Sequence, residues 1–265
     1  MKINKIVVSL FTAGLMASPL ANATNGYFAH GYGMKAKGMA GVGIALPQDS
    51  IAAATNPAGM VLLGDRMDLG LDLFKPTRGA DIAGNNCGPG CSLDGTYDGN
   101  GKSLFFIPEI GYNKMLSSDM SLGVSIYGNG GMNTQYDINP FAAFGSSGAA
   151  GINLEQLFIA PTWAMKLNPD HSIGVALNLV YQTFSATGLQ AFASMSSNAA
   201  ALTNNGKDSS TGVGMRLGWT GELTPMLTMG ATYQPKTKMS KFSKYAGLFA
   251  EQGGFDIPAT YGLGI

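Results

Sequence analysis

Charged residues are scarce in this sequence, and those present cancel one another. Asp, Glu, Lys and Arg make up only 12% of the 265 residues, against about 25% in an ordinary soluble domain. The 16 basic residues balance 16 acidic ones, so no surplus charge favours nucleic acid or an anionic membrane surface. We therefore expect no nucleic-acid partner.

Long apolar runs are also missing. After residue 23, no stretch reaches the roughly eighteen consecutive apolar residues that a membrane-spanning helix needs. The sequence excludes a transmembrane helix there. It leaves a transmembrane barrel open, because barrel strands are short and only alternately apolar.

Residues that carry chemistry are few. His30 and His171 are the only histidines, and no Ser and carboxylate can be assigned to either as a catalytic triad. The Gly-rich run at 38–43 lacks the Lys-Ser/Thr that follows in a phosphate loop. We predict no enzymatic activity, no cofactor and no metal site.

The only two cysteines, Cys87 and Cys91, stand in the motif CGPGC. In an exported protein such a pair favours a local disulfide. A metal site would need further ligands nearby, and the sequence offers none. We predict a disulfide that orders a loop.

Residues 1–23 are predicted to be a secretory signal peptide. Two early lysines, an apolar core at 6–16 and a small-x-small cleavage site at 21–23 have the required order. The alternative, an N-terminal membrane anchor, needs about twenty apolar residues, and Thr, Gly, Ser and Pro interrupt earlier. We expect the mature chain to begin at Thr24.

Glycine is abundant, with 38 residues, and it suits closely packed strands and turns better than helices. After Asp65, segments alternate between apolar and polar residues, which is the period of a β-strand with one apolar face. Phe158 breaks this alternation. The segments are 67–73, 104–114, 121–127, 156–167, 173–182, 212–222, 227–234 and 257–265.

The connections between these segments alternate in length. Tight turns at 116–119, 168–171 and 224–226 separate long connections at 77–103, 129–153, 188–210 and 236–256. This alternation is typical of an outer-membrane barrel, whereas the alternative, a secreted β-sandwich, gives no reason for it. Aromatic residues near strand ends fit interface girdles: Tyr112, Tyr127, Trp163, Tyr181, Trp219 and Tyr233.

Residues 24–65 precede the first strand, and we predict that they plug the barrel as a hatch. An eight-stranded barrel has room only for its own side chains, so a segment this large needs a wider one. The segment 257–265 has no closing strand after it, and an open sheet edge in lipid is costly. We expect residues 66–265 to be part of an all-β, transmembrane antiparallel barrel, with about eight strands visible, in a C-terminally truncated fragment.

The hatch contains the motif Asp-Ser-x-Ala-x-x-x-x-Asn-Pro-Ala, with Asn56, Pro57 and Ala58 at its end. Its place after an export signal and before paired long loops resembles the FadL/TodX (OmpP1) family of outer-membrane transporters for long-chain fatty acids and other hydrophobic compounds. The resemblance covers the mature chain in pattern and the hatch in motif. It implies a fourteen-stranded barrel whose hatch plugs the lumen, and a lateral opening at a kink in the third strand.

Two sites in the sequence fit these features. Pro57 pushes Asn56 out of the α region, and the Asn amide can bond nearby backbone groups, so the motif is either a simple turn or a latch between hatch and wall. Gly128, Gly130 and Gly131 follow the third strand and permit a bulge or lost pairing. They are candidates for the kink, although an ordinary strand end explains them equally well.

The long connections are apolar for cell-surface loops, which favours a groove for hydrophobic ligand; loops that cap one another over the barrel are the alternative. One of them, 189–202, has the spacing of a short amphipathic helix. Lys236, Lys238, Lys241 and Lys244 are placed to meet a ligand carboxylate or lipopolysaccharide phosphates. The candidate groove residues are Phe141, Phe144, Phe192, Met195, Leu248 and Phe249.

The favoured function is passive uptake of long-chain fatty acids or similar hydrophobic compounds across the bacterial outer membrane. We expect capture at the outside loops, passage past the hatch, lateral exit, contact with outer-membrane lipid and lipopolysaccharide, and a monomer. A general porin is one alternative, but the lumen-facing charges are sparse: Asp68, Asp72, Glu109, Arg216 and Glu222. A surface adhesin is the other.

Overall fold

The structure is a computed structural model that describes residues 26–85, 87–88 and 91–265. The predicted signal peptide lies outside the described residues. Among the helices of the described part, none has the length and apolar character needed to cross a membrane.

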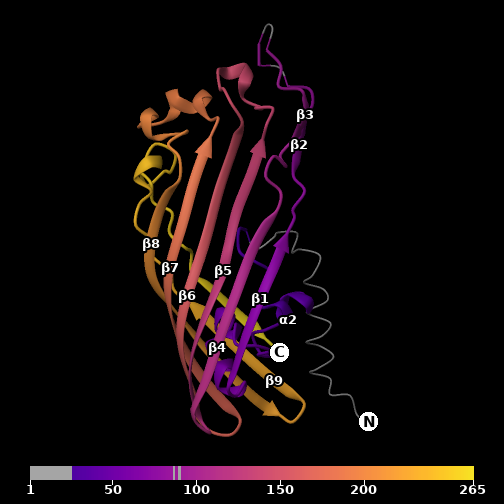
Figure 1. Cartoon of the computed structure of the whole chain (residues 1–265), viewed down its shortest axis with the longest axis vertical. Coiled ribbons are helices and arrows are strands. Elements are labelled where there is room, and N and C mark those ends of the chain that lie inside the picture. The colour runs from indigo at the N-terminus through magenta and orange to yellow at the C-terminus, as the bar shows by residue number, and fades with distance from the viewer. Residues whose placement is uncertain (1–25, 86, 89–90) are drawn as a thin grey trace.

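An antiparallel sheet of eight strands forms the wall of the molecule, in the order β1-β4-β5-β6-β7-β8-β9-β10 (Figure 1). Each of the eight predicted segments is a strand, which confirms the all-β prediction. A separate hairpin of β2 (Gly79–Ile82) and β3 (Gly95–Asp98) lies in the connection between β1 and β4. The strands of the wall are β1 (Arg66–Phe74), β4 (Phe105–Ser117), β5 (Met120–Tyr136), β6 (Ala150–Lys166), β7 (His171–Thr187), β8 (Asp208–Thr224), β9 (Leu227–Gln234) and β10 (Thr260–Gly264).

The two faces of the sheet differ as the alternation predicts. On β7, Leu177 and Leu179 point outward and are 45% and 40% exposed, whereas Ala176 and Asn178 point inward and are fully buried. On β1, Leu69 is 71% exposed. Apolar side chains thus cover the outer face, as on a sheet that contacts lipid.

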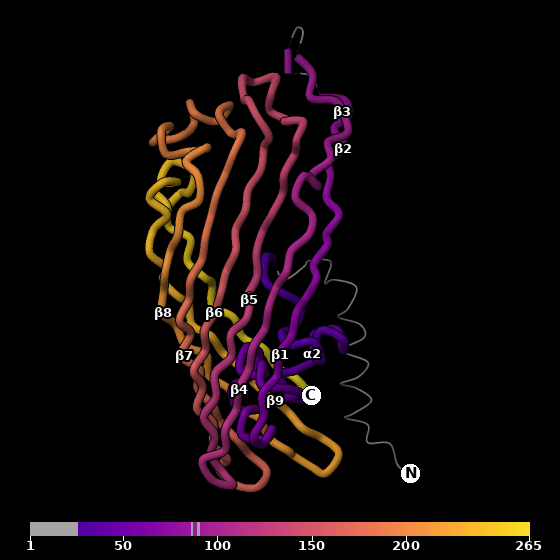
Figure 2. Tube along the Cα trace, in the orientation of Figure 1, coloured from indigo at the N-terminus to yellow at the C-terminus, as the bar shows by residue number. Residues whose placement is uncertain are grey.

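The N-terminal segment, residues 26–65, packs on the inner face of the sheet. It contains α2 (Met34–Gly38) and the 3₁₀ turns η2 (Ala52–Ala54) and η3 (Pro57–Leu62). Figure 2 shows its indigo trace between the middle of the sheet and the end that carries the short turns. Small side chains let this segment approach the wall closely, and Ala54 and Ala58 are fully buried.

The core between the N-terminal segment and the wall is partly aromatic. Tyr127 on β5 is fully buried and stacks on Phe158 of β6, with ring centroids 5.4 Å apart. The prediction that Tyr127 belongs to an interface girdle is therefore wrong. Phe158 breaks the alternation of apolar and polar residues because it points inward, where Ile51 and Ala54 of the N-terminal segment pack in the same cluster.

The third wall strand is longer than predicted. β5 continues through its glycines to Tyr136, and β6 already begins at Ala150, so the connection spans 137–149 rather than 129–153. Gly128, Gly130 and Gly131 all pair with residues of β6, and the register shifts only between Gly128 and Gly130. Backbone hydrogen bonds to β6 therefore maintain the strand where its side-chain pattern fades.

The long connections contain short 3₁₀ turns. These are η4 (Ala142–Phe144), η5 (Gln190–Met195), η6 (Ala199–Ala201) and η7 (Ser243–Tyr245). The amphipathic α-helix predicted at 189–202 is absent from this described loop, which forms η5 and η6 instead. Gly188 has a φ of 68° and Ser196 is extended, so the helical stretch is confined to two short turns.

Candidate functional site: the docked N-terminal segment and the seam between β4 and β5

The Asn-Pro-Ala motif is docked against the wall by its Asn amide. The side-chain nitrogen of Asn56 lies 2.7 Å from the carbonyl oxygen of Ile44, 2.9 Å from that of Trp219 and 3.0 Å from the Thr220 hydroxyl. Its side-chain oxygen accepts from the Ala58 N–H at 3.1 Å. Asn56 is 1% exposed, so one buried amide joins two parts of the segment to β8.

The local geometry follows the sequence argument. Asn56 is extended, with φ −146° and ψ 106°, and Pro57 begins η3, as expected for a residue that precedes proline. On the wall, a Cβ atom at Gly218 would overlap the Asn56 side-chain oxygen, and one at Gly174 would overlap the Pro57–Ala58 peptide. Two paired glycines thus leave the room that the motif occupies.

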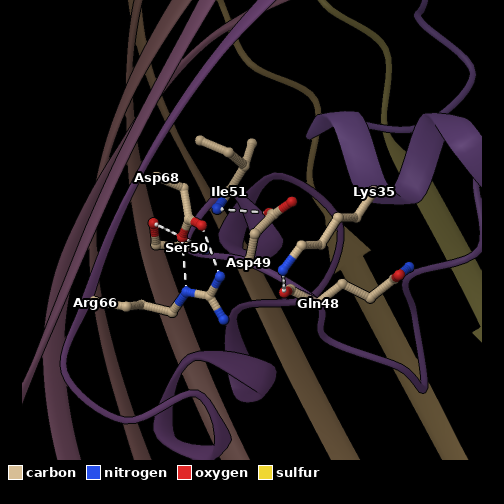
Figure 3. Close-up of polar contacts among 7 residues, drawn as sticks. All are labelled: Lys35, Gln48, Asp49, Ser50, Ile51, Arg66 and Asp68. Atoms are coloured by element: carbon tan, nitrogen blue, oxygen red, sulfur yellow. Dashed lines mark hydrogen bonds and ion pairs between the residues drawn. The ribbon is translucent and has the colours of Figure 1, made fainter.

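A polar cluster fixes the neighbouring part of the segment to β1 (Figure 3). Asp68 accepts hydrogen bonds from the Ser50 N–H at 2.9 Å, the Ser50 hydroxyl at 2.7 Å and the Arg66 Nε at 2.7 Å. Asp49 accepts from the Ile51 N–H at 3.0 Å. Burial raises the pKa of the Asp49 carboxyl, and the bond from Ile51 opposes this.

An ion-pair triad ties α2 to the same side of the wall. Lys37 Nζ lies 2.7 Å from Glu109 Oε1 on β4 and 3.1 Å from Asp72 Oδ2 on β1. The Glu109 side chain is 1% exposed, so this is a largely desolvated contact. Two of the predicted lumen-facing charges are therefore neutralised in part by the N-terminal segment.

β4 and β5 separate at a point next to this triad. Their ladder ends at the pair Ile110–Ile126, and the register of β5 against β6 shifts between Gly128 and Gly130, which is the signature of a β-bulge. Beyond Ile126, β5 has no ladder partner on β4. We call this gap, between residues 105–109 of β4 and 127–131 of β5, the seam.

The N-terminal segment takes the place of β4 along the seam. The Ala29 N–H donates to the Asn129 carbonyl at 3.2 Å, and the Gly131 N–H donates to the Tyr27 carbonyl at 2.9 Å. Phe28 forms an antiparallel bridge with Gly130. The segment therefore acts as a short substitute strand that satisfies the free edge of β5.

The three predicted kink glycines have different surroundings. A Cβ at Gly130 would overlap the Tyr27 carbonyl, one at Gly128 would lie 2.8 Å from Ile107 Cγ2, and one at Gly131 would lie 2.6 Å from the Leu154 carbonyl on β6. Gly128 and Gly130 thus line the seam, whereas Gly131 is crowded by the other neighbouring strand. The glycines lie within a continuous strand, so the strand-end explanation is wrong.

The six candidate groove residues divide into two groups at the long-loop end. Phe141 and Phe192 meet edge to face with centroids 4.9 Å apart, and Phe144 and Met195 are 47% and 74% exposed beside them in sequence. Leu248 and Phe249 instead pack on a buried cluster that contains Phe184, Phe242 and Tyr245. The structure does not bring all six together.

The structure also shows the contacts of the two cysteines and of two of the four loop lysines. Cys87 and Cys91 are joined by a disulfide, with Cα atoms 5.2 Å apart. Of the four loop lysines, Lys236 pairs with Asp256 at 2.8 Å, and Lys244 Nζ donates to the Lys207 carbonyl at 2.9 Å. These two already have partners within the protein.

Sequence reasoning missed the glycines that receive the motif and a cavity near the short turns. The cavity has a volume of about 190 Å³, and its lining includes His171 and Glu222 of the wall and Ala45 and Leu62 of the N-terminal segment. Gly212, Gly214 and Gly218 lie on one face of β8, with Arg216 between the last two. Such a row of missing side chains on one strand face is a signal of close backbone approach.

Comparison with known proteins identifies relatives of this arrangement. Residues 14–260 match the family model described as outer membrane protein transport protein (OMPP1/FadL/TodX). The Pseudomonas putida toluene transporter TodX is similar in structure, with a TM-score of 0.63 and 18% identity over 91% of this chain and 67% of that chain. A Pseudomonas aeruginosa FadL homologue has a TM-score of 0.59 and 19% identity over 89% and 65%.

The Ralstonia pickettii toluene transporter TbuX has a TM-score of 0.61 and 21% identity over 79% of this chain and 60% of that chain. This chain therefore spans about two thirds or less of the length of the relatives described. A sequence search of curated proteins finds no match.

Proposed function

Because the chain belongs to the outer membrane protein transport family (OMPP1/FadL/TodX), we propose that it carries hydrophobic compounds passively across the bacterial outer membrane. The family's members are outer-membrane transport channels rather than enzymes, and this chain has their β-barrel fold. In this proposal the loops, the docked segment and the seam each perform one step of that transport.

Capture is assigned to the long-loop end, which faces the outside of the cell in this proposal. Phe144 and Met195 are exposed there, close in sequence to Phe141 and Phe192, whose rings are in contact. Exposed apolar side chains on a cell surface favour transient contact with a hydrophobic solute. Phe249 lies deeper in the aromatic cluster and would meet the solute second.

The N-terminal segment is assigned the role of the hatch, with Asn56 as its latch. Three acceptors around one buried amide support this role, since breaking such contacts leaves buried groups unpaired. The ion pairs of Lys37 hold the same segment at the seam. A solute that passes must displace at least part of it.

Exit is assigned to the seam. The proposal depends mainly on the way in which the edge of β5 is occupied there. Backbone atoms of residues 27–29, rather than strand β4, occupy the edge of β5 at the bulge. A few hydrogen bonds of an irregular segment open more easily than a continuous ladder. Ile107 lies beside Gly128 and Phe28 beside Gly130, so apolar side chains border part of the seam, and a hydrophobic solute would pass through it sideways into lipid.

The substrate class is hydrophobic, either long-chain fatty acids or neutral hydrocarbons. Two of the solved relatives are described as toluene transporters, and the family model includes FadL. A general porin is less well supported, because Asp68, Asp72 and Glu109 are engaged by Arg66 and Lys37 rather than forming an open charged ring. Adhesion to a surface gives no role to the seam.

Gene-dependent uptake tests this proposal. Cells with and without the full-length gene are supplied with radiolabelled toluene, radiolabelled oleate and a small hydrophilic antibiotic. We expect the gene to accelerate uptake of toluene, oleate or both, and to leave antibiotic uptake unchanged. Acceleration of the antibiotic alone would support a porin instead, and no acceleration of either hydrophobic probe would contradict the proposal.

A further inference from the structure

The end of the seam nearest the long loops is held by the base of the β2–β3 hairpin. The Gly101 N–H donates to the Gln135 carbonyl at 3.1 Å, and the Gln135 N–H donates to the Gly99 carbonyl at 3.2 Å. Asn100 forms a parallel bridge with Gln135. Two backbone hydrogen bonds therefore take over where β4 no longer reaches β5.

Arg78 is the side chain that reinforces this junction. Its Nη1 donates to the Asn133 carbonyl and, at 2.9 Å, to the Asn133 side-chain oxygen, and its Nη2 donates to the Lys102 carbonyl. Its guanidinium carbon also lies 5.8 Å from the centre of the Phe105 ring on β4. One side chain thus touches the hairpin base and both strands that border the seam.

The backbone of Arg78 is itself fixed. Its N–H donates to the Asn100 side-chain oxygen at 2.8 Å, and its carbonyl accepts from the Asn100 amide at 2.8 Å and the Gly99 N–H at 3.0 Å. An arginine anchored in this way loses less freedom when its rigid fork binds. Its contacts to β5 are charge-assisted, the stronger class of hydrogen bond.

We propose that Arg78 is a positioning residue that sets the length of the opening in the seam and hence the largest solute that can leave through it. This inference rests on the proposed lateral exit. Residues 127–132 lie between the last ladder pair at Ile126 and the Arg78 contact at Asn133. At about 3.3 Å per residue this stretch of β5 is roughly 20 Å long.

Removal of Arg78 lengthens the opening. The two hydrogen bonds at Gln135 would then hold the junction alone, and such a short parallel pairing is weak. Solutes small enough for the native opening gain little from the extra length. The exit rate of a bulkier solute rises more, so removal of Arg78 changes the selectivity between solutes.

The experiment compares toluene with pyrene, a bulkier neutral hydrocarbon, in cells that carry the full-length gene. The variants are Arg78→Ala, Arg78→Lys and the matched control Lys102→Ala. Lys102 lies over the same Phe105 ring at 5.6 Å, but only its main-chain carbonyl contacts Arg78, so the control removes an equal charge beside the seam and leaves the contacts to β5 intact. The amount of folded protein is measured from its heat-modifiable band in outer membranes.

We expect the ratio of pyrene to toluene uptake to rise by about threefold to tenfold in Arg78→Ala, the effect of one or two lost charge-assisted bonds. The rise should be smaller in Arg78→Lys, because an ammonium can reach Asn133 but cannot bridge to Lys102 at the same time. The ratio should stay at the wild-type value in Lys102→Ala.

An unchanged ratio in Arg78→Ala, with gene-dependent toluene uptake intact, overturns this inference and leaves the proposed function standing. Equal losses of both uptakes that follow the amount of folded protein also overturn it, since they indicate a purely structural role. Toluene and pyrene uptake that do not depend on the gene, even for the wild type, contradict the proposed hydrocarbon transport itself.

Discussion

Single glycines decide how closely the N-terminal segment approaches the wall. Gly174 and Gly218 lie under the Asn-Pro-Ala motif, Gly130 lies under Tyr27, and a Cβ at Gly111 would lie 2.5 Å from the Ser50 carbonyl oxygen. Glycine is used here because another backbone passes where a side chain would be, which is one of its recurring uses in strands. The docked position of the segment is therefore encoded on the wall as well as in the segment.

The Asn56 amide gives a direct test of the latch. Asn56→Ala leaves the carbonyls of Ile44 and Trp219 without this donor, so we expect the docked segment to be destabilised by about 1–3 kcal/mol. Hydrogen exchange of residues 44–62 should accelerate, and a hydrophilic antibiotic should leak in, while the barrel stays assembled. Leu62→Ala, at an exposed position of the same turn, is the matched control; equal exchange in both variants would contradict the latch.

Gly130 and Gly131 allow two neighbouring positions to be compared. Gly130→Leu places its side chain against the Tyr27 carbonyl in the seam, so hydrophobic uptake should fall while the amount of folded protein is maintained. Gly131→Leu meets the Leu154 carbonyl across the β5–β6 ladder, so the amount of folded protein should fall. Uptake is measured per folded molecule, and identical behaviour of the two variants would argue against a seam at Gly130.

At the scale of elements, alternation in the sequence was enough to place the eight strands and their inward faces. It misplaced Tyr127, because an aromatic near a strand end is equally compatible with a membrane interface and with a buried contact. It ended β5 too early, because glycines carry no side-chain pattern although their N–H and C=O groups continue the ladder to β6. The end of β5 depends on backbone pairing, which the pattern of side chains in the sequence does not predict.

The same limit applies to the candidate site. The bend at Asn56 and Pro57 followed from local backbone rules, and the structure has it. The partners of that bend on β7 and β8 lie more than a hundred residues away in sequence, and no local rule connects them. The pairing of residues 27–29 with the bulge could not be predicted for the same reason, and these residues also lack the alternation of apolar and polar side chains that marks a strand.

The connection at 235–259 should respond to pH through Asp256. Its bond from Lys236, and then its bond from the Met239 N–H, hold the pKa of Asp256 below its usual value. A carboxyl whose pKa is depressed on folding contributes stability above its unfolded pKa of about 3.9, and this contribution is lost as the pH falls through the folded value.

We therefore expect hydrogen exchange in residues 237–257, corrected for intrinsic rates, to accelerate on acidification below about pH 4. Asp256→Asn should remove most of that dependence, and Lys241→Gln, a charge change in the same connection, should keep it. If exchange in Asp256→Asn still accelerates on acidification, the pH dependence comes from another titrating group and the prediction is wrong.

At the scale of the whole molecule, the wall and the N-terminal segment are interdependent. β5 has no ladder partner on β4 along the seam, and the segment supplies both the proposed latch at β8 and the substitute strand at β5. Displacement of the segment would therefore unplug the interior and free the edge of β5 together. Lateral exit through the seam, once the segment leaves it, is the central claim of the transport account.

A reversible cross-link across the seam tests that claim most directly. A Cβ built at Gly128 lies 2.8 Å from Ile107 Cγ2, so Ile107→Cys with Gly128→Cys has the proximity that a disulfide between β4 and β5 requires. The measurement is the uptake rate of whichever probe, toluene or oleate, depends on the gene, before and after reduction, with each single-cysteine variant as control. We predict that the oxidised pair takes up the probe at nearly the rate of cells lacking the gene and recovers on reduction; wild-type uptake by the fully oxidised pair would contradict lateral exit through the seam.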